Sequence, residues 1–218
     1  MVLLTLAAAG LSPRPAAASE STNQSALETD AQGWSDILPP ANLAGWTRVA
    51  IPPTNTLGRA QWHLDDTGKI LVCDGDGGHE MLRYDKKSGD CVFHVEFCFT
   101  KIQKANARYN SGVFIRNSAD GVIWHQAQVA DNGGFLFGNT PVDGKLKRFN
   151  LPLKEHRMNP AGEWNTIEVT ARDKTISVWL NGATTSQFSE CGVPEGYVAL
   201  EAEGYRIEFR NLKLKELR

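Results

Sequence analysis

The segment from Cys91 to Phe99 most limits how this chain can fold. One face of this run is apolar, with Cys91, Phe93, Val95, Phe97 and Phe99, while His94 and Glu96 take the other. A period of two residues is typical of a β-strand with one buried face. Shorter runs of this kind recur between turn-forming residues, and no stretch has the period of an amphipathic helix. The sequence therefore predicts an all-β fold, a two-sheet antiparallel sandwich.

Three strand pairs are predicted to be hairpins because turn-forming residues separate them. They are residues 61–64 with 69–73, 110–116 with 123–129, and 166–171 with 175–182. Residues 132–160 have little periodicity, so we expect a cleft wall or lid there, or else a solvated basic loop. The 218 residues are enough for one domain with a sizeable core, which we place at residues 34–218.

The N-terminal residues have the pattern of an export signal. Residues 2–11 are apolar, and Ala16-Ala17-Ala18 offers a small-residue cleavage site before Ser19. The apolar run is too short to span a bilayer. We therefore predict a signal peptide at residues 1–18, a flexible leader at 19–33, and a periplasmic or extracellular protein that is free of the membrane once the signal is removed.

Export would permit disulfides among the four cysteines, Cys73, Cys91, Cys98 and Cys191. Cys91 and Cys98 lie on one predicted strand, roughly 23 Å apart, so they cannot bond to each other. The remaining pairings are Cys73–Cys91 with Cys98–Cys191, or Cys73–Cys98 with Cys91–Cys191. Buried free thiols are the alternative, because a domain of this size does not need cross-links.

Neither the charge of the chain nor the spacing of its ligand residues predicts a nucleic-acid partner, a metal or a cofactor. A net charge of −2, with Lys and Arg scattered, gives no basic field for nucleic acid. No spacing of ligand residues predicts a metal, and no cofactor is predicted. A divalent cation would require convergence of His94, Glu96, Glu201 and Glu203. The segment Asp74–Gly78 resembles a calcium loop only faintly and is predicted to be a turn, because it lacks the third acid and the distal Glu.

The hairpin over residues 110–129 carries the candidate binding site. Its core face would hold Val113, Ile115, His125, Ala127 and Val129, leaving Asn110, Phe114, Arg116, Trp124, Gln126 and Gln128 on the other face. Aromatic rings cover the apolar face of a pyranose, and amides and guanidinium groups bind its hydroxyls. A carbohydrate is thus the predicted ligand, and a solvated outer sheet face is the alternative.

Five motifs in this order carry a resemblance to a known family: Leu43–Trp46, Asn110–Arg116, Gly162–Thr166, Val178–Gly182 and Ile207–Leu212. Over residues 34–217 the chain resembles the 3-keto-disaccharide hydrolase domain family. The resemblance implies a concanavalin A-like jelly-roll sandwich. It also implies an exported bacterial protein that acts in the breakdown of sugars oxidised at C3.

The chain departs from the family pattern at two places. Many members read Glu-x-Gln where this chain has Gln126-Ala127-Gln128, and Leu-Gln-x-His-Gly where it has Leu200–Gly204. One acid is lost on one strand and gained on another. The chain could keep the chemistry with a relocated carboxylate, act on another sugar, or bind without cleaving.

The implied chemistry requires a base, because a ketone at C3 acidifies the proton on C2 and permits loss of the C1 substituent. Glu201 and Glu203 lie roughly 7 Å apart on one strand face, so they can flank one substrate. Their repulsion would raise one pKa. We predict both as catalytic, with Arg116 donating to the developing oxyanion. The predicted substrate-binding residues are Asn110, Phe114, Trp124, Gln126, Gln128 and Tyr197.

These residues are expected to meet in one cleft, on a sheet made by strands 91–99, 110–116, 123–129 and 197–204. In a first alternative, the two acids are surface groups paired with Arg116, Arg206 or Arg210. In a second, the chain is a non-catalytic, lectin-like carbohydrate-binding domain. A conventional glycosidase is less favoured, because the Glu-x-Asp-x-x-Glu strand of jelly-roll glucanases is absent from the sequence.

Overall fold

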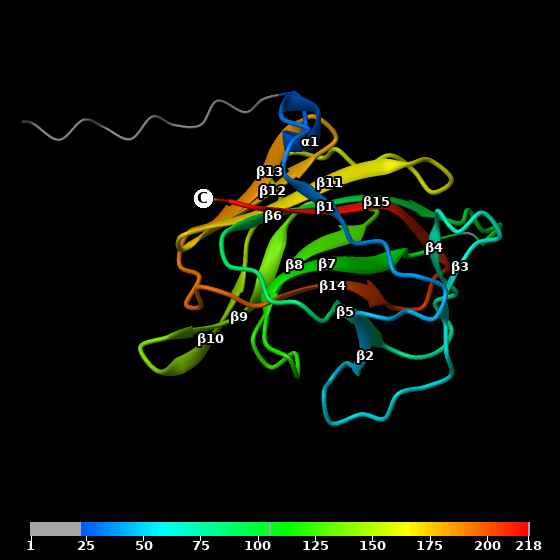
Figure 1. The fold of residues 1–218 in the computed structure, drawn as a ribbon, viewed down its shortest axis with the longest axis horizontal. Coiled ribbons are helices and arrows are strands. Elements are labelled where there is room, and N and C mark those ends of the chain that lie inside the picture. Colours follow the sequence, from blue (N-terminus) through cyan, green and yellow to red (C-terminus); the bar gives the residue numbers. More distant parts are fainter. Residues whose placement is uncertain (1–22, 105, 218) are drawn as a thin grey trace, which may run out of the picture.

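Over residues 23–104 and 106–217, the part of the chain that the computed structural model describes, two antiparallel sheets pack face to face (Figure 1). The back sheet runs in the order β13 (Ala183–Phe188), β12 (Thr175–Leu180), β11 (Asn165–Arg172), β6 (Cys91–Phe99), β15 (Ile207–Glu216), β4 (Leu71–Cys73) and β3 (Trp62–Leu64), and β1 (Trp34–Asp36) also pairs with β15. The site sheet runs in the order β10 (Lys145–Asn150), β9 (Leu136–Val142), β8 (Trp124–Ala130), β7 (Asn110–Asn117), β14 (Tyr197–Ala202), β5 (Glu80–Tyr84) and β2 (Trp46–Ala50). This architecture confirms the predicted all-β jelly-roll sandwich.

The core lies between the sheets and is filled by the apolar positions of the alternating pattern. Phe93 and Val95 of the back sheet, and Val113, Ile115 and Leu200 of the site sheet, are 0% exposed. Burial of each such side chain stabilises the fold by roughly 1.5–3 kcal/mol. The opposite faces of the same strands carry the polar residues, which leaves the outer face of the site sheet available for a ligand.

Strand β6 lies in the back sheet and not in the site sheet, which corrects one expectation. It pairs with β11 and β15, so the predicted site sheet loses its strand 91–99. His94 and Glu96 consequently point outward on the far side of the molecule. His94 Nδ1 lies 2.8 Å from Glu168 Oε1, and Glu96 accepts a hydrogen bond from Arg210 Nε. Alternation shows that one strand face is buried but does not say in which sheet the strand lies.

The three predicted hairpins are confirmed as the antiparallel pairs β3–β4, β7–β8 and β11–β12. The region 132–160, expected to lack periodicity, contains a further hairpin of β9 and β10 at the edge of the site sheet. Its burial alternates along Leu136–Val142, but Gly138 and Pro141 interrupt the apolar pattern in the sequence. This hairpin supplies one wall of the cavity described below.

The predicted signal peptide and residues 19–22 lie outside the described residues. From residue 23 onward the predicted leader forms a capped turn that contacts the back sheet. Ser25 and Glu28 form a capping box around α1 (Ala26–Thr29). The carboxylate of Glu168 accepts hydrogen bonds from the backbone N–H groups of Ala26 and Leu27, which attaches this turn to the back sheet. Among the described residues, no helix is long and apolar enough to cross a membrane.

All four cysteines are buried and free, so the free-thiol alternative holds in place of the disulfide pairings. Burial raises the pKa of the Cys73 and Cys91 thiols to about 12. A buried thiol behaves as a small apolar side chain and is protected from oxidation. The sandwich is therefore held by its core and its sheet hydrogen bonds.

Candidate functional site

A cavity of about 370 Å³ opens on the outer face of the site sheet. Its apolar lining includes Ala50, Ile51, Pro53, Met81, Phe114, Trp124 and Phe137. Its polar lining includes His79, Asn110, Asn117, Gln126, Gln128, Arg148, Glu201 and Glu203. Most residues that the sequence assigns to the sugar site thus line one cavity. Its size and its mixture of rings and amides are typical of a small-ligand site.

Three side-chain amides, those of Gln126, Gln128 and Asn110, connect the two carboxylates of the cavity. Gln126 Nε2 donates to Glu201 Oε2 at 2.7 Å and lies 3.3 Å from Gln128 Oε1. Gln128 Nε2 donates to Asn110 Oδ1, and Asn110 Nδ2 donates to Glu203 Oε2 at 2.6 Å. These side chains come from β8, β7 and the end of β14, which are neighbours in the sheet. The hydrogen bonds fix the orientation of both acids before any ligand enters.

His79 lies beside both carboxylates and forms a hydrogen bond with Glu201. Its Nε2 lies 2.8 Å from Glu201 Oε1 and 3.8 Å from Glu203 Oε2. The His79 side chain is 35% exposed, whereas that of Glu201 is 4% exposed, so the imidazole stands between the buried acid and the solvent. No sequence pattern marks His79 as a site residue, because it lies 122 positions before Glu201 and follows a Gly-Gly pair.

Buried Glu80, the first residue of β5, anchors the backbone that carries His79. Glu80 accepts hydrogen bonds from Arg48 Nε at 2.8 Å and from Trp62 Nε1 at 2.8 Å. The carbonyl of His79 itself accepts a hydrogen bond from the Ile51 N–H at 3.0 Å. The backbone of His79 and the side chain of the next residue, Glu80, are thus held, and the imidazole enters the cavity from a fixed position.

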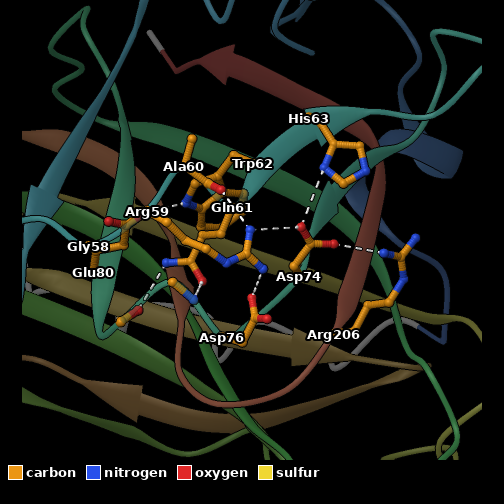
Figure 2. A network of polar contacts seen from close by, with 12 residues as sticks. Gly58, Arg59, Ala60, Gln61, Trp62, His63, Asp74, Asp76, Glu80 and Arg206 are labelled. Atoms are coloured by element: carbon orange, nitrogen blue, oxygen red, sulfur yellow. Dashed lines mark hydrogen bonds and ion pairs between the residues drawn. The ribbon is translucent and has the colours of Figure 1, made fainter.

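The loop before β5, Asp74–Gly78, is fixed by arginines, as Figure 2 shows. Arg59 contacts both Asp74 and Asp76, and Arg206 Nη1 donates to Asp74 Oδ1 at 2.8 Å. The acids that gave this segment its faint calcium-loop pattern are therefore paired with guanidinium groups. They stabilise the entry into β5.

Gly112 leaves room for the amide that contacts Glu201. A Cβ atom at this position would lie 2.3 Å from Gln126 Nε2 and 2.7 Å from Gln126 Cγ. Such a distance is far below van der Waals contact, so Gln126 would have to move. The glycine of the Asn110–Arg116 motif thereby has a physical role, because it allows Gln126 to cross β7 and reach Glu201 on β14.

Gln126 and Glu201, two of the three positions at which this chain departs from the family pattern quoted above, are in contact; the third is Glu203, at the histidine of that pattern. Gln126 stands where many members have an acid, and Glu201 stands where they have an amide. The hydrogen bond of 2.7 Å between these side chains means that the acid–amide pair persists with its members exchanged. The Glu201 carboxylate thus lies one hydrogen bond from Gln126, and both side chains line the same cavity.

The surroundings of the pair raise the pKa of both groups. Burial raises the pKa of Glu201, although the hydrogen bond with His79 opposes that shift. The hydrogen bond that the protonated His79 donates to the Glu201 carboxylate raises the pKa of His79, against the effect of its own partial burial. A raised pKa makes the Glu201 carboxylate a stronger base and keeps the proton on the His79 imidazole, so the pair provides a base and an acid in direct contact.

The cavity also contains one imidazole and two carboxylates that could bind a divalent cation, from His79, Glu201 and Glu203. One ligand atom from each residue lies within 4.8 Å of the other two. This set differs from the one expected from the sequence, because His94 and Glu96 belong to β6 in the back sheet. Only Glu201 and Glu203 of the expected set meet in the cavity.

Arg116 lies outside the cavity, which corrects its predicted catalytic position. Its φ of 52° accompanies a bulge in the pairing of β7 with β14, and a bulge reverses the alternation of side chains. The guanidinium is buried and donates to Asp90 Oδ1 at 2.6 Å, to Val193 O at 3.2 Å and to Asp173 O. Arg116 therefore holds three loops together at the end of the sandwich.

Tyr197, predicted to bind substrate, also lies apart from the cavity. It pairs with Asn117 on the far side of the same bulge. The guanidinium of Arg83 stacks on its ring, with 4.6 Å between the Arg83 Cζ and the ring centroid. The tyrosine is thus engaged by a cation at the rim of the sheet.

Phe137 and Arg148 line the cavity although the sequence analysis did not single them out. Both belong to the β9–β10 hairpin, where Arg148 pairs with Asn139 and Phe137 pairs with Asn150. Phe137 meets Trp124 edge to face, with 5.1 Å between ring centroids. The alternation of Phe135 and Phe137 in the sequence is the signal that could have revealed Phe137.

Comparison with solved structures shows the same fold in several carbohydrate-related proteins. A Parabacteroides distasonis protein proposed to be a glycosyl hydrolase has a TM-score of 0.59 at 16% identity, covering 90% of this chain and 100% of that chain. A carbohydrate-binding module from Bacillus subtilis has a TM-score of 0.56 at 15% identity, covering 79% and 96%. A β-glucanase from Bacillus licheniformis has a TM-score of 0.51 at 13% identity, covering 83% and 97%. At these identities the likeness shows the jelly-roll fold alone.

Sequence comparison identifies the family. No curated protein matches the chain. The profile of the 3-keto-α-glucoside-1,2-lyase-like domain matches residues 33–215, which is most of the chain and includes every residue of the cavity. The chain therefore belongs to this carbohydrate-active, glycosyl hydrolase-like family, the 3-keto-α-glucoside-1,2-lyase-like domains.

Proposed function

We propose that this protein cleaves 3-keto-glycosides by base-assisted elimination, with Glu201 as the base and His79 as the acid. One observation carries the proposal: a buried carboxylate contacts an imidazole at 2.8 Å in a cavity lined by aromatic rings and amides. A sugar fits such a lining because rings cover its apolar face and amides bind its hydroxyls. Membership of the 3-keto-α-glucoside-1,2-lyase-like family supports the same reaction class.

In the proposed reaction, the Glu201 carboxylate removes the C2 proton, which the neighbouring C3 ketone acidifies. The electron pair of the C–H bond forms the C1–C2 double bond, and the C1–O bond breaks. The leaving oxygen takes the proton of the His79 imidazolium. The products are an unsaturated 3-keto sugar and the free alcohol, and later addition of water to the double bond would complete a net hydrolysis.

The developing enolate needs a positive partner, and Arg116 is too far from the cavity to provide it. Arg148 replaces it in the proposal, because its guanidinium lines the cavity from β10. Glu203 binds a sugar hydroxyl and, at 3.8 Å from His79 Nε2, favours the protonated imidazole. Trp124 and Phe114 contribute apolar surface for the sugar ring.

The test uses a 3-keto-disaccharide carrying deuterium at C2. Elimination releases the deuterium to solvent and forms an enone that absorbs ultraviolet light, whereas direct hydrolysis keeps the label. Glu201→Gln preserves shape but removes proton transfer, so turnover should fall by about 10²–10⁴-fold. Glu96→Gln, on the outer face of the back sheet, is the matched control and should retain wild-type turnover. Full activity of Glu201→Gln would show that the base lies elsewhere.

A second candidate is sugar binding without cleavage, as in a lectin-like domain. It is favoured by the chain of hydrogen bonds from Glu201 to Glu203, since a rigid, preformed polar face also suits a binding module. Calorimetry with unoxidised disaccharides separates the two functions. Binding of these sugars, together with no turnover of any 3-keto substrate by the wild type, would establish the binding module.

The proposed reaction needs no cofactor, because the side chains themselves supply the base and the acid. Turnover should therefore survive treatment with a chelator. Loss of activity that Mn²⁺ or Zn²⁺ restores would instead assign a metal to His79, Glu201 and Glu203. We also propose export, from the signal pattern of residues 1–18, and sequencing the N-terminus of the mature protein tests it.

A further inference from the structure

A second hollow, of about 360 Å³, lies on the β9–β10 side of the site sheet. It is lined by Asn132, Phe135, Asn150, Leu151 and Leu153. None of these side chains carries a charge. The reaction proposed above uses none of them, so their arrangement calls for its own explanation.

Aromatic rings connect this hollow to the main cavity. Phe137 lines the main cavity and Phe135 lines the second hollow, with 5.7 Å between their ring centroids. The Phe135 carbonyl accepts a hydrogen bond from the Gln128 N–H at 2.9 Å, so the two regions share one stretch of sheet. Trp124 extends the series at the other side of Phe137, at 5.1 Å. The three rings form a continuous track.

Amides flank this track on the hairpin side. Asn150 pairs with Phe137 across β9 and β10, and it lines the second hollow together with Asn132. Rings with interleaved amides suit a neutral pyranose, whose faces are apolar and whose edge carries hydroxyls. The lack of charged groups in the lining disfavours a uronate or a phosphorylated sugar.

We propose that this second hollow is a subsite for a neutral sugar, the leaving-group unit of a 3-keto-disaccharide. The assignment rests on the proposed function, because Glu201 must reach C2 of the oxidised ring and so places that ring in the main cavity. The next ring then continues along Phe137 toward Phe135. The family resemblance already implies a disaccharide; the hollow adds the position of its second ring, on the β9–β10 hairpin, and the expectation that a glycoside with a small aglycone is a poorer substrate.

The test compares two substrates that differ only in the second ring, a 3-keto-disaccharide and the corresponding 3-keto methyl glycoside. Phe135→Ala should lower kcat/KM for the disaccharide by about tenfold, the effect of losing one ring contact. For the methyl glycoside the change should stay under about twofold. Asn150→Ala should discriminate in the same direction. Ile102→Ala, which truncates an exposed apolar side chain outside both hollows, is the matched control.

Equal losses on both substrates in both variants, or no loss on either, would overturn the subsite. If Phe135→Ala does not fold, Phe135→Leu and Asn150→Ala are used for the same comparison.

Calorimetry with the unoxidised disaccharide and methyl glycoside tests the subsite separately from the reaction. If the wild type cleaves no 3-keto substrate but binds the disaccharide more tightly, and Phe135→Ala abolishes that preference, the subsite stands while the elimination fails. Equal affinity of the wild type for both unoxidised sugars would also refute the subsite.

Discussion

Exchange of Gln126 and Glu201 tests whether the position of the carboxylate or only its presence in the cavity supports turnover. The two side chains share a hydrogen bond of 2.7 Å, so the double variant Gln126→Glu/Glu201→Gln moves the charge to the neighbouring strand without changing composition. The single variants give the other two states. Glu201→Gln leaves an amide pair, and Gln126→Glu creates two carboxylates in contact.

The structure sets the expected magnitudes. Glu201→Gln removes the base and should lower kcat/KM by about 10³-fold, within the usual range for proton transfer. In the exchanged variant a carboxylate returns close to the original oxygen but loses the direct contact with His79, whose Nε2 lies 2.8 Å from Glu201 Oε1. A shift of this order costs about 10–10²-fold, so the exchange should recover at least about tenfold over Glu201→Gln.

The carboxyl pair created by Gln126→Glu has a predictable titration. Two acids in contact cannot both ionise readily, so one pKa rises and the pH–rate profile moves toward higher pH. We expect about a tenfold loss at pH 7. The double-mutant cycle then gives a coupling of about 3 kcal/mol or more between the two positions, well above the error expected for independent sites.

Initial rates on a 3-keto-disaccharide, measured from pH 5 to pH 9, provide the assay, and thermal unfolding checks that each variant is folded. In the wild type, activity should rise as Glu201 ionises and fall as His79 loses its proton. The reasoning is refuted if the exchanged variant is folded and no more active than Glu201→Gln. In that case the proton acceptor depends on a contact that only position 201 can make.

Three further variants examine the surroundings of the site. Arg116→Lys should destabilise the fold by about 2–4 kcal/mol, because three hydrogen bonds of the buried guanidinium are lost, while kcat and KM of the folded protein stay unchanged; urea unfolding and kinetics together check this. Burial lowers the pKa of His125 to about 4, so stability is full above pH 6.5 and falls as the pH drops toward 4, by at most about 3 kcal/mol. His125→Gln should reduce the loss of unfolding free energy between pH 7 and pH 4.5, as measured by urea titration at each pH. If the variant loses as much stability between these pH values as the wild type, the assignment to His125 is contradicted. Gly112→Ala should displace Gln126 and lower kcat/KM by about tenfold or more, whereas retention of full activity would show that the contact of Gln126 with Glu201 is dispensable.

The sequence by itself determined the strands and most of the polar face that forms the cavity. Local alternation was sufficient because a strand places every second side chain on one face, whatever lies on the other side. The hairpin of β7 and β8 therefore brought Gln126 and Gln128 to the correct face, and the same rule placed Glu201 and Glu203 beside them.

Arg116 and β6 lie elsewhere than the sequence predicts, for specific physical reasons. A single residue with φ of 52° at Arg116 reversed the alternation of β7 and turned the guanidinium away from the cavity. An alternating sequence does not indicate to which sheet its strand belongs, so β6 was predicted in the site sheet although it lies in the back sheet. A bulge and a sheet assignment both depend on partners that are distant along the chain.

Only the tertiary structure revealed the imidazole beside the acid. His79 enters from a loop with no strand pattern, and its contact with Glu201 spans 122 positions. The second hollow likewise exists only because β9 and β10 fold beside β8. Local sequence determines which face a side chain takes, because that depends on backbone geometry within a few residues. Which faces meet depends on sheet order, and sheet order is decided by the packing of the whole chain.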